Sequence, residues 1–358
     1  MTDVIKPQRA FIKFIAYLQV IGIILVVFGH SFHEYPDNAY GQSLLIYRLC
    51  YNFRMPLFMF VSGFLMMYTE FMKEKTLSFR RFGLVKIRRL LIPYFVLTLL
   101  TYFPRASLSD MADESVTMSL TGMLKSFFVT DMLPISYFWF IQASFILLIS
   151  TYLVISICRR LRLPDSSAIT ILIAISICLE CFVWKGPEIF GYKQAIFYST
   201  FFIAGIAYCR YFPTIDRIIP LESVFSFCLS FAVWILTFIH WEGTAYAQIS
   251  SFFGIAMCIA FSRLMVKYHV TVIDHLIGAN YMIFLLSWYF NVATQQVLRH
   301  FVTLPWQIHT LLSLTFGIYV PWLGYVYLRD NQHRKWARHI SFLLGQSFRK
   351  NKKEDRHS

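Results

Sequence analysis

Apolar residues gather along this chain in long runs, which short polar and basic segments separate. A helix needs about 20 apolar residues to cross a hydrocarbon core about 30 Å thick. Backbone polar groups find no water in lipid, so each run is expected to be helical. The runs cover residues 11–32, 44–68, 89–104, 136–157, 168–184, 192–210, 221–240, 245–262, 273–296 and 308–328. The pattern predicts an all-α, polytopic transmembrane helical bundle of about ten spans.

The composition favours a membrane protein over a soluble one. Hydrophobic residues make up 57% of the 358 residues and charged residues only 15%, too few to cover the surface of a soluble protein of this size. The mean hydropathy is +0.56. The first apolar run continues to Phe32 with no small-residue cleavage site, so it is predicted to be a retained span rather than a signal peptide.

The basic residues are distributed unevenly among the loops. A net charge of +14 would fit a nucleic-acid partner, but most of the 33 Lys and Arg lie in every second loop and after residue 329. The opposite loops include the acidic stretch from Asp110 to Glu114. The positive-inside rule then places both termini in the cytoplasm, and no nucleic-acid partner is expected. The chain divides into a transmembrane domain, 1–330, and a basic cytoplasmic tail, 331–358.

Several ionisable residues lie within or beside the first two predicted spans. His30 and Glu34 come at the outer end of the first span, and Arg48 and Arg54 lie in the outer half of the second. A short loop joins these spans, so the groups are expected to be neighbours. An imidazole can take a proton from a hydroxyl, and a guanidinium can hold an acyl oxygen or a glycan carboxylate, or pair with Glu34. The alternatives are an interfacial anchor for His30 and a snorkelling side chain for Arg48.

The sequence lacks motifs that would indicate other chemistry. It contains no His-Glu-x-x-His, no Gly-x-Ser-x-Gly and no phosphate-binding Gly-rich loop. A zinc protease, a serine hydrolase and a nucleotide hydrolase therefore lack support, and no metal is expected.

Six segments together resemble motifs of the acyltransferase-3 family of bacterial integral-membrane O-acyltransferases. They are Leu18–His30, Met55–Phe64, Lys86–Tyr94, Tyr137–Ile141, Phe201–Gly205 and Ile277–Leu286. The first of these ends in the family's signature His, here His30. Two positions depart from the family pattern: Gln19 stands where a basic residue is usual, and Trp288 where a His is frequent. A neutral amide donates hydrogen bonds but cannot neutralise a developing charge.

The resemblance implies transfer of an acyl group, commonly acetyl, from cytoplasmic acyl-CoA to a hydroxyl of a cell-surface glycan across the bacterial inner membrane. His30 would be the general base, with Gln19 and Arg54 orienting or polarising the acyl group. Glu34, Arg48 and Trp139 are candidates for binding the acceptor. The candidates for holding the phosphates of coenzyme A are Lys86, Arg88 and Arg89. Membrane topology alone would also account for these three basic residues, and interfacial anchoring for Trp139.

Two other function classes fit the same residues. Intramembrane Arg and His also serve transporters, so a permease or flippase for a glycan or small solute is an alternative. A catalytically silent accessory subunit of polysaccharide synthesis would explain Gln19 without any chemistry.

Overall fold

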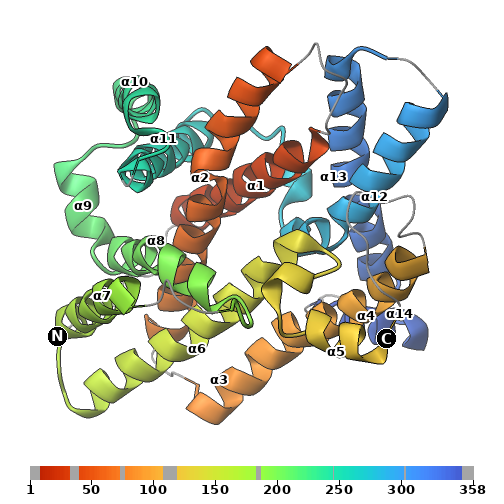
Figure 1. Cartoon of the computed structure of the whole chain (residues 1–358). Helices are drawn as coiled ribbons and strands as arrows, with labels where there is room; N and C mark the ends of the chain where they lie inside the picture. Colours follow the sequence, from red (N-terminus) through yellow and green to blue (C-terminus); the bar gives the residue numbers. More distant parts are fainter. Residues whose placement is uncertain are drawn as a thin grey trace, which may run out of the picture.

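A computed structural model describes residues 9–32, 40–72, 77–107, 119–182, 187–244, 246–301 and 304–348. Apart from one isolated bridge between Val129 and Ile189, the regular structure within these ranges is helical (Figure 1). The α-helices are α1 (Arg9–Ser31), α2 (Tyr40–Met66), α3 (Phe79–Lys86), α4 (Ile92–Ser107), α5 (Leu120–Ser126), α6 (Trp139–Arg160), α7 (Asp165–Phe182), α8 (Tyr192–Arg210), α9 (Phe212–Ile218), α10 (Val224–Trp241), α11 (Ala247–Lys267), α12 (Asn280–Phe301), α13 (Trp306–Asp330) and α14 (Lys335–Leu343). Short π-helical turns, η1 (Met67–Phe71) and η2 (Ile87–Leu91), extend α2 and precede α4.

Each of the ten predicted apolar runs forms a helix. Within the described ranges, six helices are long and apolar enough to cross a membrane, or seven if the bent pair of α8 and α9 is one span. The chain is therefore an all-α, multi-pass membrane protein. The 16-residue α4 is shorter than the 18 residues that the test requires, and the count of about ten spans stays a prediction.

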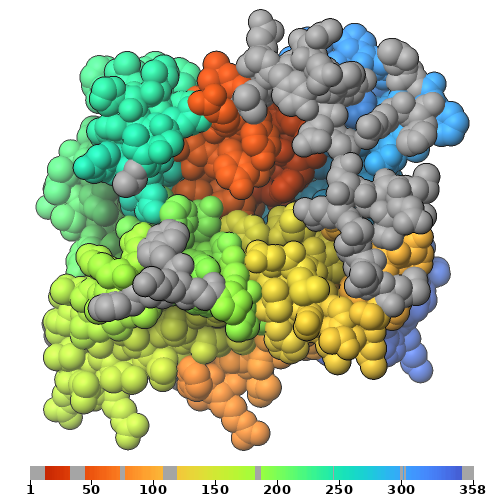
Figure 2. All heavy atoms as spheres, viewed as in Figure 1, coloured from red at the N-terminus to blue at the C-terminus, as the bar shows by residue number. Residues whose placement is uncertain are grey.

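Helix α1 lies at the centre of the bundle, in contact with α2, α11, α12 and α13 (Figure 1). The face shown in Figure 2 leaves part of α2, in orange, visible between the α10–α11 pair and the yellow segment around α5. Helix α2 also packs closely along α8. A Cβ on Gly63 would lie 1.9 Å from the Phe202 carbonyl oxygen, and one on Gly205 would lie 1.9 Å from that of Phe60. The two glycines allow backbone contact between helices where lipid supplies no hydrophobic drive for association.

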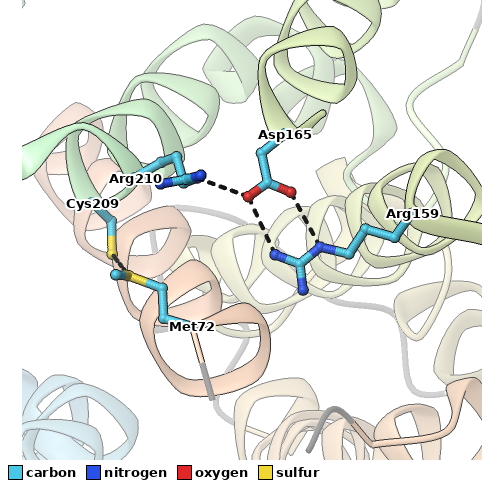
Figure 3. A network of polar contacts seen from close by, with 5 residues as sticks. All are labelled: Met72, Arg159, Asp165, Cys209 and Arg210. Carbon is cyan, nitrogen blue, oxygen red and sulfur yellow. Dashed lines mark hydrogen bonds and ion pairs between the residues drawn. The ribbon is translucent and has the colours of Figure 1, made fainter. Parts of the chain in front are cut away.

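Polar contacts join helix ends at one face of the bundle. The Asp165 carboxylate, at the start of α7, accepts hydrogen bonds from Arg159 at the end of α6 and from Arg210 at the end of α8 (Figure 3). The Cys209 thiol points to the Met72 sulfur beyond the end of α2, at 3.4 Å. Lys13 near the start of α1 pairs with Asp274, at 3.2 Å, in the turn before α12. The Asp165 contacts join the start of α7 to the ends of α6 and α8, which run in the opposite direction. Which side of the membrane this face occupies stays a prediction.

The predicted basic tail begins with an ordered element. Helix α14 lies in it and packs back on the bundle, with Ala337 and Ser341 buried. The residues from Arg349 onward lie outside the described ranges. The division of the chain at residue 330 stays a prediction.

Candidate active site

His30 occupies the last turn of α1, and its half-buried side chain faces the bundle. Side chains of a helix lean toward its N-terminus, so the imidazole is directed back into the protein rather than out along the axis. The His30 ring lies 5.0 Å, between centroids, from the ring of Tyr137 just before α6. Behind it, the Gln295 amide of α12 donates a hydrogen bond of 3.0 Å to the His30 carbonyl oxygen. The last carbonyls of a helix lack partners within the helix, and Gln295 supplies one.

Arg54 of α2 lies against the same turn of α1. A Cβ on Gly29 would be only 1.6 Å from Arg54 Nη1, so the absence of a side chain at Gly29 makes room for the guanidinium beside His30. Arg54 is 3% exposed, and its Nε and Nη1 have no hydrogen-bond partner among the described residues. The Arg54 Cζ lies 4.4 Å from the centre of the Tyr51 ring and 5.7 Å from that of Tyr47. The predicted proximity of His30 and Arg54 is therefore present in the structure.

Gln19 lies further along the same face of α1. Eleven residues are about three helical turns, so Gln19 and His30 share a face about 16 Å apart along the axis. Gln19 lies in the seam between α1 and α2 together with Gly22, Phe58 and Val61, where the side chains leave no room for a water molecule. Arg54, Phe58 and Val61 recur at helical spacing on α2, so the guanidinium and the residues near Gln19 lie on one stripe of that helix. Gln19 is thus remote from the imidazole but on the same helix–helix seam.

The predicted acceptor-binding residues have different surroundings. Arg48 forms an ion pair with Glu242, which follows α10, and the Arg48 side chain is 45% exposed. Trp139 stacks on Tyr198 of α8, with ring centroids 5.2 Å apart, and Tyr198 lies within electrostatic range of Arg54. Glu34 lies outside the described residues. Arg48 is therefore at an exposed rim, whereas Trp139 packs against α8 through Tyr198. Their roles stay predictions.

The three predicted phosphate-binding residues lie at and within the η2 turn, and each contacts an aromatic ring. Lys86 Nζ is 4.8 Å from the Phe82 ring centre, Arg88 Cζ is 4.7 Å from that of Phe342, and Arg89 Cζ is 5.9 Å from that of Tyr281. None of the three forms an ion pair with a described carboxylate. Burial lowers the pKa of Lys86 below its ordinary value; Glu70 opposes this shift and Arg89 adds to it. Ring contacts leave the N–H donors of such cations available to an anion.

The sequence interpretation missed a polar layer behind His30. Asn291 and Gln295, four residues apart on α12, and Ser313 of α13 are all buried. The Asn291 amide donates to the Val27 carbonyl oxygen at 3.4 Å, and Gln295 contacts the Ser313 hydroxyl as well as His30. Two side-chain amides on one face of α12 therefore hold the final turn of α1. The signal was present in the sequence, since buried amides within an apolar run need hydrogen-bond partners.

Comparison with known families agrees with this arrangement. The family model described as an acyltransferase domain matches residues 12–326, a region that includes His30, Arg54 and the η2 turn. No curated protein and no solved structure matches the chain. The matched region covers most of the chain, and its helices are those of a multi-pass membrane protein. The chain therefore belongs to the acyltransferase-3 family of membrane acyltransferases.

Proposed function

We propose that the protein moves an acyl group, commonly acetyl, from cytoplasmic acyl-CoA to a hydroxyl of an exported or cell-surface glycan at the bacterial inner membrane. One observation carries the proposal. Arg54 is a buried guanidinium whose Nε and Nη1 have no hydrogen-bond partner among the described residues, and it lies over Gly29 directly beside His30. A buried cation within a membrane protein is costly, and N–H donors left unpaired there are suited to an incoming oxygen.

In the proposed reaction His30 acts as general base. Its free ring nitrogen takes the proton of the acceptor hydroxyl as the hydroxyl oxygen forms a bond to the thioester carbonyl carbon. Negative charge develops on the carbonyl oxygen, where the Arg54 N–H groups would stabilise it. The carbon–sulfur bond then breaks, and the coenzyme A thiolate receives the proton from the imidazolium. The products are the O-acyl glycan and free coenzyme A.

The donor would approach from the opposite face of the bundle. Lys86, Arg88 and Arg89 offer positive charge without a carboxylate ion pair among the described residues, which suits the phosphates of coenzyme A. The seam between α1 and α2, where Gln19 lies, is closed in this structure and would have to open for the donor to reach His30. In this position Gln19 orients the donor by a hydrogen bond and carries no charge.

The test is acyl transfer by the purified, full-length protein in vesicles supplied with acetyl-CoA and glycan. His30→Ala is expected to insert normally and to lose transfer by roughly 10²–10⁴-fold, the usual contribution of a general base. His240→Ala is the matched control, because His240 also lies in the last turn of a predicted span and is exposed. The control is expected to keep its activity.

Three results would contradict the proposal. Full transfer by His30→Ala would exclude His30 as the base. Glycan flux across the vesicle without acylation would favour a transporter. Binding of acetyl-CoA without any transfer by the wild-type protein would favour a catalytically silent accessory subunit.

A further inference from the structure

Helix α14 has three distinct faces along its length. One face is buried against the bundle, one exposes large apolar side chains, and one carries the polar and basic residues. Ala337 and Ser341 form the buried face, and Leu344, just after the helix, continues it. The apolar face comprises Trp336, Ile340 and Leu343, which are 38–42% exposed and recur at the spacing of one helical stripe. The polar face comprises Lys335, Arg338 and His339, and the exposed ring of Phe342 lies on the same side of the helix. The helix contains no acidic residue. A helix that presents an apolar stripe beside a basic one is typical of the membrane–water interface.

The position of α14 keeps it beside the membrane. Four residues separate the end of α13, a candidate span, at Asp330 from the start of α14 at Lys335. The ring of Trp336 contacts that of Tyr327 on α13, with centroids 5.8 Å apart, and the Gln332 amide donates to the Ser341 hydroxyl at 2.7 Å. These contacts fold α14 back onto the end of the span. Its exposed stripe is therefore held where α13 leaves the bilayer.

Helix α3 has the same character at the same face of the bundle. It exposes Leu84 and Val85, and its basic residues Arg80 and Arg81 are also exposed. The two helices are joined through η2, because Arg88 lies over the ring of Phe342 in α14. The Gly345 backbone, just after α14, also lies close to the Arg89 carbonyl oxygen, with φ of +63°. Two short helices with exposed apolar and basic residues thus flank one edge of the bundle.

We propose that α14 is an interfacial helix that binds anionic phospholipid in the leaflet where α13 ends. Trp336, Ile340 and Leu343 lie between the headgroups and the acyl chains, and Lys335 and Arg338 contact the phosphates of anionic headgroups. A lipid surface fits better than a protein partner, because the stripe adjoins a predicted span and its basic neighbours are complementary to anionic lipid.

The first test measures where the stripe lies. Ile340→Cys and Leu343→Cys are compared with Arg338→Cys in the full-length protein, reconstituted in phosphatidylcholine–phosphatidylglycerol vesicles. A membrane-impermeant maleimide labels exposed thiols, and the labelling of the seven native cysteines is subtracted with the wild-type protein. We expect labelling at 340 and 343 to be at least about tenfold slower than at 338, because lipid excludes the reagent. Equal rates at all three positions would overturn the proposal.

The second test measures whether protection of the stripe from labelling depends on the charge of the lipid. Protection at 340 is expected to increase when phosphatidylglycerol is added to phosphatidylcholine vesicles, and the increase is expected to disappear in Lys335→Gln/Arg338→Gln. Lys125→Gln, an exposed lysine of α5, is the control and should keep the increase. Protection that does not depend on phosphatidylglycerol would refute the anionic-lipid contact. Protection in native membranes but not in pure lipid vesicles would assign the stripe to a protein partner instead.

Discussion

Two buried arginines lie toward opposite ends of the bundle, and their surroundings differ in one respect. Arg263 of α11 is 6% exposed and pairs with the carboxylates of Asp216 and Glu222, the latter at 2.5 Å. Arg54 of α2 is 3% exposed and has aromatic rings and the Gly29 backbone around it. Among the described residues no carboxylate forms an ion pair with Arg54.

We interpret the difference as that between a charge held within the fold, Arg263, and one kept for the substrate, the role proposed for Arg54. A buried charge is costly unless it is paired, and carboxylates compensate Arg263 within the fold. Within the part of the chain that the structure describes, no carboxylate compensates Arg54 in this way, and its Nε and Nη1 have no hydrogen-bond partner. This is expected of a group whose partner arrives with the substrate. The predictions below test this distinction.

Exchanging each arginine for Met should produce opposite phenotypes. Arg54→Met is expected to lower acyl transfer by roughly 10²–10³-fold, as loss of an oxyanion donor does, with little loss of stability because no described carboxylate is paired with Arg54. Arg263→Met is expected to keep the transfer rate per folded molecule and to lose about 1–2 kcal/mol of stability, because its partners are partly hydrated. Transfer rate and thermal unfolding of the purified proteins measure both. A stability loss in Arg54→Met as large as that in Arg263→Met would remove the distinction.

A methyl group added at Gly29 of α1 should displace the Arg54 guanidinium without changing its charge. In Gly29→Ala the new Cβ would collide with Nη1, which must move, and transfer is expected to fall by about tenfold, in line with an overpacking cost of about 1–3 kcal/mol. Gly22→Ala is the matched control two turns away on the same stripe, where a Cβ would lie 3.1 Å from the Phe58 ring. The control should change transfer less. Equal losses in both variants would indicate general packing damage rather than displacement of Arg54.

The smallest expected effect is a pH dependence of KM for acetyl-CoA, which would come from Lys86 at the opposite face of the bundle. Lys86 is charged only below its pKa, and burial lowers that pKa. Phosphate binding should therefore weaken as pH rises through the lowered pKa, at a lower pH than for an ordinary lysine. We expect KM for acetyl-CoA to rise about twofold to fivefold in this range, as for a pair worth about 0.5–1 kcal/mol. Lys86→Arg keeps its charge and should have a flat KM over the same range. A rise of the same size in Lys86→Arg would exclude Lys86 as the titrating group.

The local pattern of apolar residues predicted most of the helices, but the sequence predicted only part of the candidate site. The ten apolar runs are helices, and the short connection between the first two spans correctly predicted that Arg54 lies beside His30. The contact of Gly63 on α2 with the backbone of α8 could not be predicted, although both segments had been identified as motifs. Asn291 and Gln295 were overlooked because a polar residue in an apolar run does not reveal which helix it faces. The sequence interpretation also missed that the predicted tail contains the ordered helix α14, because this helix depends on contacts with α13 and η2.

The sequence by itself determined that this protein crosses the membrane several times as helices, because apolar run length and the cost of unpaired backbone groups in lipid are local properties. It also determined the family, through motifs in the right order. Only the tertiary structure decided which helices surround α1, which of the two buried arginines pairs with described carboxylates, and where the amides that hold His30 come from. Those outcomes depend on contacts between residues far apart in the chain, such as Gln295 with His30, and hydrophobic periodicity does not specify them.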